Sequence, residues 1–342
     1  MKRVLFTSTP LQTLLLLGVL FLFSCGSDEG EAPDVSHINA DFQVHRLEGE
    51  LIGLDTPEKA AAWLDAHPKL AQQFFRRDQY PAGELEKLMA QFAQHPASDT
   101  LAMDAKRVFG DFEEQREKFK KAFQYLKHYY PEERIPDIYT IVSGFGAFCE
   151  SPDLFLGPDY IVIGLDFFAG ASSTYRPDIP GYMLDRYKPD AMVTFVMKQF
   201  SRKHIKSSFV DQTLLADMVY YGKACFFTKK MLPNAADSVI IGYNTQDLAN
   251  VYYNQEDIYT HFIENDLLFK TDPGIKRKYV GERPNVPEIA DVCPGRVGRW
   301  LGWQFVARYV YHSEKSFQEV LLMEDAQKIF QGSRYQPQNP ES

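Results

Sequence analysis

Two short stretches decide the fold of this 342-residue chain: Ile138-Tyr139-Thr140-Ile141-Val142-Ser143-Gly144-Phe145 and Tyr160-Ile161-Val162-Ile163-Gly164-Leu165. Both are rich in β-branched and aromatic residues, and Gly and Pro residues surround both, which is typical of strands in a sheet. Alternation of apolar and polar residues over 42–47 predicts one more strand. The sequence therefore predicts a small sheet that interrupts a chain of helical periodicity.

Helices are predicted before and after these strands. Thr56 followed by Pro57 is typical of a helix start, and Ser316 with Glu319 forms a capping box at the start of the last helix. Helices are expected at about 57–75, 84–94, 100–130, 190–204, 211–231, 245–269, 295–312 and 316–331. The predicted fold class is α+β, mainly α-helical, with a single domain over residues 41–335 and a polar tail at 336–342.

The expected helix at 100–130 rests on the clearest periodicity in the chain. Its apolar residues recur at intervals of 4, 7, 4 and 3, as one face of an amphipathic helix requires. They are Val108, Phe112, Phe119, Phe123 and Leu126.

The N-terminus has the layout of a secretory signal peptide over residues 1–24. Lys2 and Arg3 precede an apolar run from Leu11 to Phe23, which is shorter than the roughly 20 residues that cross a bilayer as a helix. The run ends Leu22-Phe23-Ser24-Cys25, which resembles the bacterial lipobox. Cleavage before Cys25 and its acylation, including palmitate, are therefore expected. An ordinary cleaved signal and an uncleaved anchor helix are the alternatives.

Residues 25–40 are expected to be a flexible acidic tether behind the lipidated Cys25. The acidic run Ser27-Asp28-Glu29 also resembles the export signal of some surface-displayed lipoproteins. The chain would thus be held in the cell envelope, in the outer membrane, facing either the periplasm or the surface. The membrane is its first expected partner.

Composition limits the remaining function classes. Hydrophobic residues make up 45% of the chain, which is enough for a packed core. The net charge of −9 argues against nucleic acid as a partner. Removing Lys2 and Arg3 leaves 35 basic against 46 acidic residues, a charge of −11. Besides Cys25, three cysteines remain (Cys149, Cys225 and Cys293), and buried free thiols are the default interpretation.

The order of a strand pair, a helix and another helix is also found in zinc metallopeptidases, where the first helix bears the motif H-E-x-x-H. No His-Glu dipeptide occurs in this chain, and the expected helix at 190–204 carries only His204, at its end. Asp166, Asp217 and Glu264 are scattered acids. No catalytic residue, metal ligand or cofactor is therefore predicted.

The stretch from Cys293 to Gln304 contains two of the three tryptophans and three closely spaced glycines, at 295, 298 and 302. Two interpretations remain open: a tightly packed core helix, and an aromatic groove that contacts a partner. Arg299 is expected to pair with an acid on a facing helix, such as Asp217. The candidate cleft or partner residues are Asp166, Asp217, Tyr221, Glu264, Arg296, Arg299, Trp300 and Trp303.

Several blocks resemble the gliding-motility lipoprotein family GldB. They are Tyr160–Gly170, Leu214–Lys223, Ile241–Tyr243, Phe262–Phe269 and Pro294–Gln304. That family is similar to predicted zinc peptidases, so the resemblance implies a helical, zincin-like (metallopeptidase-like) C-terminal half. It also implies a scaffold that keeps the acid at Asp217 but lacks both histidines, and no catalytic residue is carried over from the family.

Three hypotheses follow for the function. The first is a non-catalytic, lipid-anchored envelope protein required for gliding motility and the associated type IX secretion machinery, with other envelope proteins as partners. The second is an envelope metallopeptidase with an atypical set such as His204, Asp217 and Glu264. The third is a substrate-binding lipoprotein with a cleft beside Tyr160–Leu165.

Overall fold

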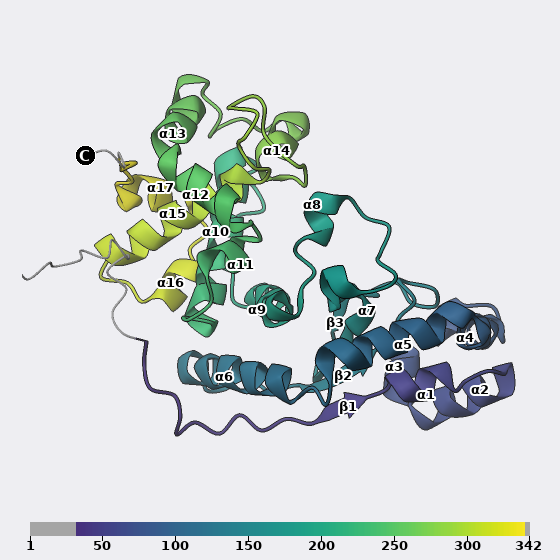
Figure 1. The fold of residues 1–342 in the computed structure, drawn as a ribbon. Helices are drawn as coiled ribbons and strands as arrows, with labels where there is room; N and C mark the ends of the chain where they lie inside the picture. Colours follow the sequence, from purple (N-terminus) through teal and green to yellow (C-terminus); the bar gives the residue numbers. More distant parts are fainter. Residues whose placement is uncertain (1–31, 339–342) are drawn as a thin grey trace, which may run out of the picture. The chain divides into compact units, whose positions relative to one another are not determined.

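A four-stranded mixed sheet lies at the middle of the chain in the computed structural model, which describes residues 32–338. The predicted signal peptide and lipobox lie outside the described residues. The strands are β1 (Val44–Arg46), β2 (Asp137–Ile141), β3 (Leu154–Leu156) and β4 (Tyr160–Gly164), in the spatial order β1-β2-β4-β3 (Figure 1). β1, β2 and β4 are parallel, whereas the edge strand β3 is antiparallel to β4.

The two strands predicted from the most strongly β-forming stretches pair directly with each other. Tyr139 of β2 lies opposite Val162 of β4, and all five residues of β4 are buried. A strand buried on both faces is expected to be continuously apolar rather than alternating, as Tyr160–Gly164 is. The short strand β3 was not predicted.

Six helices lie between β1 and β2 in the sequence: α1 (Glu48–Ile52), α2 (Pro57–Ala66), α3 (Pro68–Gln73), α4 (Glu84–Gln94), α5 (Pro96–Phe109) and α6 (Glu113–Tyr129). The predicted continuous helix over 57–75 is wrong, because Pro68 has no backbone N–H to donate and a new helix begins there.

The predicted single helix over 100–130 is also wrong. The chain turns between α5 and α6, where Gly110 and Phe112 adopt φ angles of 51° and 69°. Phe112 is buried and packs against Phe109. The helical spacing of Val108 and Phe112 therefore arises from two helices that contribute apolar residues to the same core.

Eleven further helices follow β4 among the described residues. Together with the sheet they give the predicted α+β, mainly helical class. They are α7 (Leu165–Phe168), α8 (Gly181–Leu184), α9 (Met192–Ser201), α10 (Leu214–Met231), α11 (Asp237–Ile241), α12 (Thr245–Tyr253), α13 (Gln255–Glu264), α14 (Pro273–Val280), α15 (Val297–His312), α16 (Phe317–Leu321) and α17 (Ala326–Ser333).

Two predicted helices in this half are each divided into two. The segment 245–269 forms two helices that are separated at Asn254, and 316–331 forms α16 and α17. The capping box of Ser316 and Glu319 is confirmed at the start of α16. Helix α14 was not predicted.

Helices α10 and α15 cross at two glycines. A Cβ atom on Gly302 would lie 1.9 Å from the Met218 carbonyl oxygen, and one on Gly222 would lie 2.3 Å from the Gly302 carbonyl carbon. Trp300 and Trp303 are buried. The core-helix interpretation of this stretch is confirmed, with the correction that Gly295 precedes the helix.

The described residues from Val35 onward form one compact unit. None of the helices in residues 32–338 combines the length and apolar character needed to cross a membrane. The zincin-like arrangement of the C-terminal half stays a prediction.

Candidate functional site

A cavity of about 900 Å³ lies among the helices of the C-terminal half. Residues of α8, α9, α10, α11, α12 and α15 line it, together with the loops after α8, α11 and α14. This volume falls in the range of pockets that enclose a small organic molecule. We therefore take it as the candidate site.

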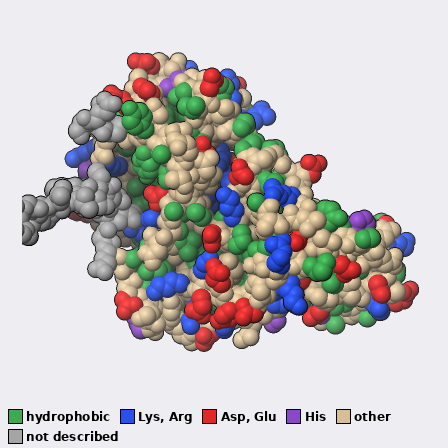
Figure 2. All heavy atoms as spheres, viewed as in Figure 1, with side chains coloured by type: hydrophobic (Ala, Val, Ile, Leu, Met, Phe, Trp, Pro, Cys, Tyr) green, Lys and Arg blue, Asp and Glu red, His purple; other side chains and the backbone are tan. Residues whose placement is uncertain are grey.

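The charge of the cavity wall is opposite in sign to that of the chain. Six basic residues line the cavity against four acidic ones, whereas the whole chain carries −9. Elsewhere the two signs are mixed, and Figure 2 shows acidic and basic side chains next to one another over the face drawn. The basic residues are Arg186, Lys188, Lys198, Arg202, Arg296 and Arg299, and the acidic ones are Asp185, Asp190, Asp247 and Glu282.

Glu282 lies at the centre of three arginines. Its carboxylate oxygens are 2.8 Å from Arg186 Nη2, 3.2 Å from Arg299 Nη1 and 3.7 Å from Arg296 Nε. Burial alone would raise the pKa of Glu282, but its arginine neighbours outweigh burial and lower it. Glu282 is thus ionised at neutral pH and fixes the three guanidinium groups in one cluster.

Local backbone geometry places Arg296 in this cluster. Its φ angle of 63° is left-handed, and its guanidinium donates hydrogen bonds to the carbonyl oxygens of Ile241 (3.0 Å) and Gly242 (2.7 Å). Gly242 also has a positive φ, of 78°, and a Cβ there would lie 2.9 Å from Arg186 Cδ. A glycine is required here because two arginine side chains pack across its α-carbon.

Arg299 links the cluster to an aromatic wall. Its Nε donates to the Val280 carbonyl oxygen at 2.6 Å, and its guanidinium carbon lies 4.2 Å from the centre of the Tyr221 ring. A cation–π contact of this kind is attractive, and more so where the two groups are partly desolvated. Tyr220 and Tyr243 also line the cavity.

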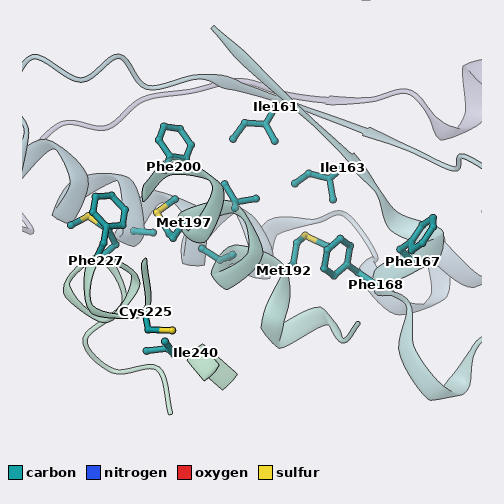
Figure 3. Packing of buried hydrophobic residues seen from close by; sticks show 14 of the residues in the cluster. Ile161, Ile163, Phe167, Phe168, Met192, Met197, Phe200, Cys225, Phe227 and Ile240 are labelled. Carbon is teal, nitrogen blue, oxygen red and sulfur yellow. The ribbon is translucent and has the colours of Figure 1, made fainter. Parts of the chain in front are cut away.

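Lys198 is the unusual charge of the site. It follows the first six residues of α9, which are largely buried. Met192, Met197 and Phe200 of this helix point into the core between β4 and α10 (Figure 3). Within residues 32–338, its ammonium group forms no hydrogen bond or ion pair. Burial and the nearby arginine charges lower the pKa of Lys198 to about 8, against an ordinary value of 10.5.

The structure brings together only part of the predicted residue set. Tyr221, Arg296 and Arg299 line the cavity, whereas Trp300 and Trp303 belong to the core. The predicted pairing of Arg299 with Asp217 is wrong. Asp217 instead pairs with Lys276 at 2.8 Å, and Arg299 pairs with Glu282, because α14 and the loop behind it supply both partners.

Asp166 supports a turn. Its carboxylate accepts hydrogen bonds from the backbone N–H and hydroxyl of Ser143 and from the N–H of Phe145. Burial raises the pKa of Asp166, although these hydrogen bonds oppose the change. They hold the turn after β2, where Gly144 and Phe145 have positive φ angles.

The three residues of the metallopeptidase hypothesis have separate surroundings. His204 stacks on Phe227 and lies 3.3 Å from Glu133, whereas Asp217 lies ten residues before Phe227 on the same helix. At about 1.5 Å per residue this separation is roughly 15 Å. Glu264 is exposed at the end of α13.

A zinc site of the peptidase kind does not fit the residues of the cavity. At a spacing of four residues, where such a helix would present two histidines, α9 presents Lys198 and Arg202 to the cavity. Two cations repel a metal ion. In the described range 32–338, no three His, Cys, Asp or Glu side chains form a group suited to a metal ion.

Other sequence predictions of this region have clear outcomes. Cys149, Cys225 and Cys293 are buried free thiols, as predicted, and Cys225 contacts the cavity. The strand beside which a cleft was expected, Tyr160–Gly164, is fully buried, and the cavity is lined by other elements.

The fold and the site together define a mainly helical α+β protein with a basic, tyrosine-lined cavity. The model of the family described as gliding motility protein GldB matches residues 28–337, and the chain belongs to this family. Neither a curated protein nor a solved structure matches the chain.

Proposed function

We propose that this protein is a lipid-anchored component of the cell envelope that is required for gliding motility and the associated secretion machinery. In this proposal it acts by binding, without catalysis, and acylated Cys25 attaches it to the outer membrane. Several acyl chains on one residue are enough for stable membrane attachment. Family membership over residues 28–337 is the observation that carries the motility role.

The arrangement of the acids supports a binding role. The groups available for an atypical peptidase site are spread over α10, α13 and the end of α9, and each has different neighbours. In contrast, the groups of the cavity come from many elements and are fixed by one shared carboxylate, Glu282. Convergence of this kind is typical of a binding site.

The proposal is tested by deleting the gene in its own bacterium and complementing the deletion. The wild-type chain is expected to restore colony spreading and export of surface adhesins. Cys25→Ser is expected to abolish incorporation of labelled palmitate, release the protein from the membrane fraction and fail to restore spreading. A deletion strain that spreads and exports adhesins normally would overturn the proposal.

The proposal that the protein acts without catalysis is tested separately. The double variant Asp217→Asn, Glu264→Gln removes two of the three acidic or basic groups of the alternative site while retaining their shape. It is expected to restore spreading fully at wild-type protein level. Loss of spreading in this variant, or one zinc ion per chain by elemental analysis of the purified protein, would favour the metallopeptidase.

Partners are identified by purifying the lipidated protein from solubilised membranes. Mass spectrometry is expected to find other envelope proteins of the gliding and secretion machinery, enriched over a purification from the Cys25→Ser strain. Equal enrichment from both strains would mean that membrane attachment has no part in assembly.

A further inference from the structure

We propose that the cavity binds a small organic phosphate, with Lys198, Arg186 and Arg299 as the groups that receive the phosphate oxygens. This inference rests on the geometry of the cavity alone and does not depend on the role in motility.

Unused hydrogen-bond donors are the first argument. Arg186 directs both terminal nitrogens at Glu282, and its Nε is buried without a partner. Arg299 uses Nε on Val280 and Nη1 on Glu282, which leaves Nη2. Lys198 contributes three N–H groups that no described residue accepts. Among these donors Arg186 Nε is fully buried, and a buried donor is costly without an acceptor. Lys198 and Arg299 line the cavity, where a ligand could accept their N–H groups.

Charge is the second argument. Arg186, Lys198, Arg296 and Arg299 form the inner cluster, and Glu282 is its one paired carboxylate. The inner cluster therefore keeps a surplus of three positive charges. Of the other acids on the wall, Asp190 pairs with Lys118. Asp185 and Asp247 form no ion pair with the cluster among the described residues, although Arg296 opposes the rise that burial causes in the pKa of Asp247. Glu282 is thus the carboxylate that pairs directly with the cluster.

The size of this surplus favours phosphate over carboxylate. A phosphate monoester carries close to two negative charges and three acceptor oxygens near pH 7, which matches donors that come from α9, α15 and the loop after α8. A carboxylate offers one charge and two oxygens in one plane. It would therefore neutralise only one of the three surplus positive charges, whereas a phosphate monoester neutralises close to two.

The rest of the cavity accommodates an organic group. Phe195, Tyr220 and Tyr221 provide aromatic surface beside the cluster, and a volume of about 900 Å³ exceeds what inorganic phosphate alone would fill. A ring or chain attached to the phosphate would pack on these side chains. The ligand class is thus a phosphate monoester with an apolar or aromatic part.

Isothermal titration calorimetry of the full chain in a nonionic detergent tests this proposal. The probes are phenyl phosphate, inorganic phosphate, benzoate and acetate at equal ionic strength. Phenyl phosphate is expected to bind best, and benzoate at least tenfold more weakly. If inorganic phosphate binds as tightly as phenyl phosphate, the phosphate site is supported and its natural ligand is the free ion.

Lys198→Met is expected to weaken phenyl phosphate binding by roughly tenfold to a hundredfold, as loss of one charge-assisted hydrogen-bond donor does. Lys198→Arg keeps the charge and is expected to retain most of the affinity. Lys120→Met, on the exposed face of α6, is the matched control and is expected to bind as wild type does.

Three outcomes would overturn the proposal: no saturable heat with either phosphate, benzoate binding as tightly as phenyl phosphate, or equal losses in Lys198→Met and Lys120→Met. Thermal melts of each variant show that it is folded. A negative titration leaves the colony-spreading results unaffected, so the two proposals fail independently.

Discussion

Replacing Lys198 with Met is expected to stabilise the protein while it weakens ligand binding. The ammonium group is subject to the positive charges of Arg186, Arg296 and Arg299 and to the thiol of Cys225, and no carboxylate is its direct partner in the described chain. Met keeps the length and most of the volume of the side chain and extends the apolar face of α9. The change therefore removes a desolvated charge with little change in packing.

The magnitude follows from the pKa. Each tenfold change in proton affinity corresponds to about 1.4 kcal/mol. Lowering the pKa of Lys198 from 10.5 to about 8 thus costs the folded state roughly 3 kcal/mol at neutral pH. Because water in the cavity screens part of this cost, we expect Lys198→Met to raise the free energy of unfolding by about 1–3 kcal/mol at pH 7.

The dependence on pH has a definite sign. Below pH 8 the lysine is protonated in both the folded and the unfolded state, so its full cost is present. Between about pH 8 and 10.5 the folded protein releases the proton before the unfolded chain does, and the wild type gains stability as the pH rises. The advantage of Lys198→Met is therefore expected to shrink over this window.

Urea denaturation of wild type and variant at pH 7, 8.5 and 9.5, without phosphate in the buffer, measures both effects. Lys120→Met is the control and is expected to change stability by less than about 0.5 kcal/mol at each pH. A destabilised Lys198→Met, or a gain that stays constant up to pH 9.5, would refute the reasoning. Adding phenyl phosphate is expected to reverse the order of stabilities, because only the wild type binds it tightly.

Three further predictions concern the framework around the site, each measured by urea denaturation. Gly302→Ala is expected to lose about 2–3 kcal/mol, because its Cβ would lie 1.9 Å from the Met218 carbonyl oxygen; Gly181→Ala, with open space around it, is the control and should change little. Glu133→Gln is expected to cost about 1–3 kcal/mol at pH 6, since His204 and Lys203 lower the pKa of Glu133 to about 2; the loss should disappear as the pH falls from 4.5 to 2. Asp166→Ala is expected to cost about 3 kcal/mol or more, because it leaves the buried backbone N–H of Ser143 and the partly buried one of Phe145 without an acceptor. A neutral result in any of the three would contradict the corresponding contact.

Sequence patterns predicted an element most accurately where the whole segment is buried in the same way. Strand β4 is apolar throughout because both of its faces are covered, and its position was predicted to within one residue. The expected helix over 100–130 failed for a related reason. Phe112 continues the helical spacing of Val108 although a turn with positive φ at Gly110 separates the two helices. The spacing of apolar residues indicates which positions are buried, but it does not indicate whether the chain continues as one helix.

The site was predicted less well because its chemistry depends on contacts between distant segments. Arg296 and Arg299 were singled out from one conspicuous stretch, but their partner Glu282 lies in a loop that carries no motif. Lys198 had a local signal that was not used: a lone cation in the apolar series of α9. Arg186 had none, because only the fold brings residue 186 to residue 282.

The close crossing of α10 and α15 explains why the cavity exists where it does. At Gly222 and Gly302 the backbones touch, so no side chain fits between the helices. Tyr221 lies next to this contact and Arg299 one turn before it, and their stacking continues the interface toward the cavity. A bulky residue at either glycine would therefore separate the arginine from the tyrosine as well as the helices. This predicts that Gly302→Ala loses affinity for phenyl phosphate at temperatures where it is still folded, whereas Gly181→Ala retains it.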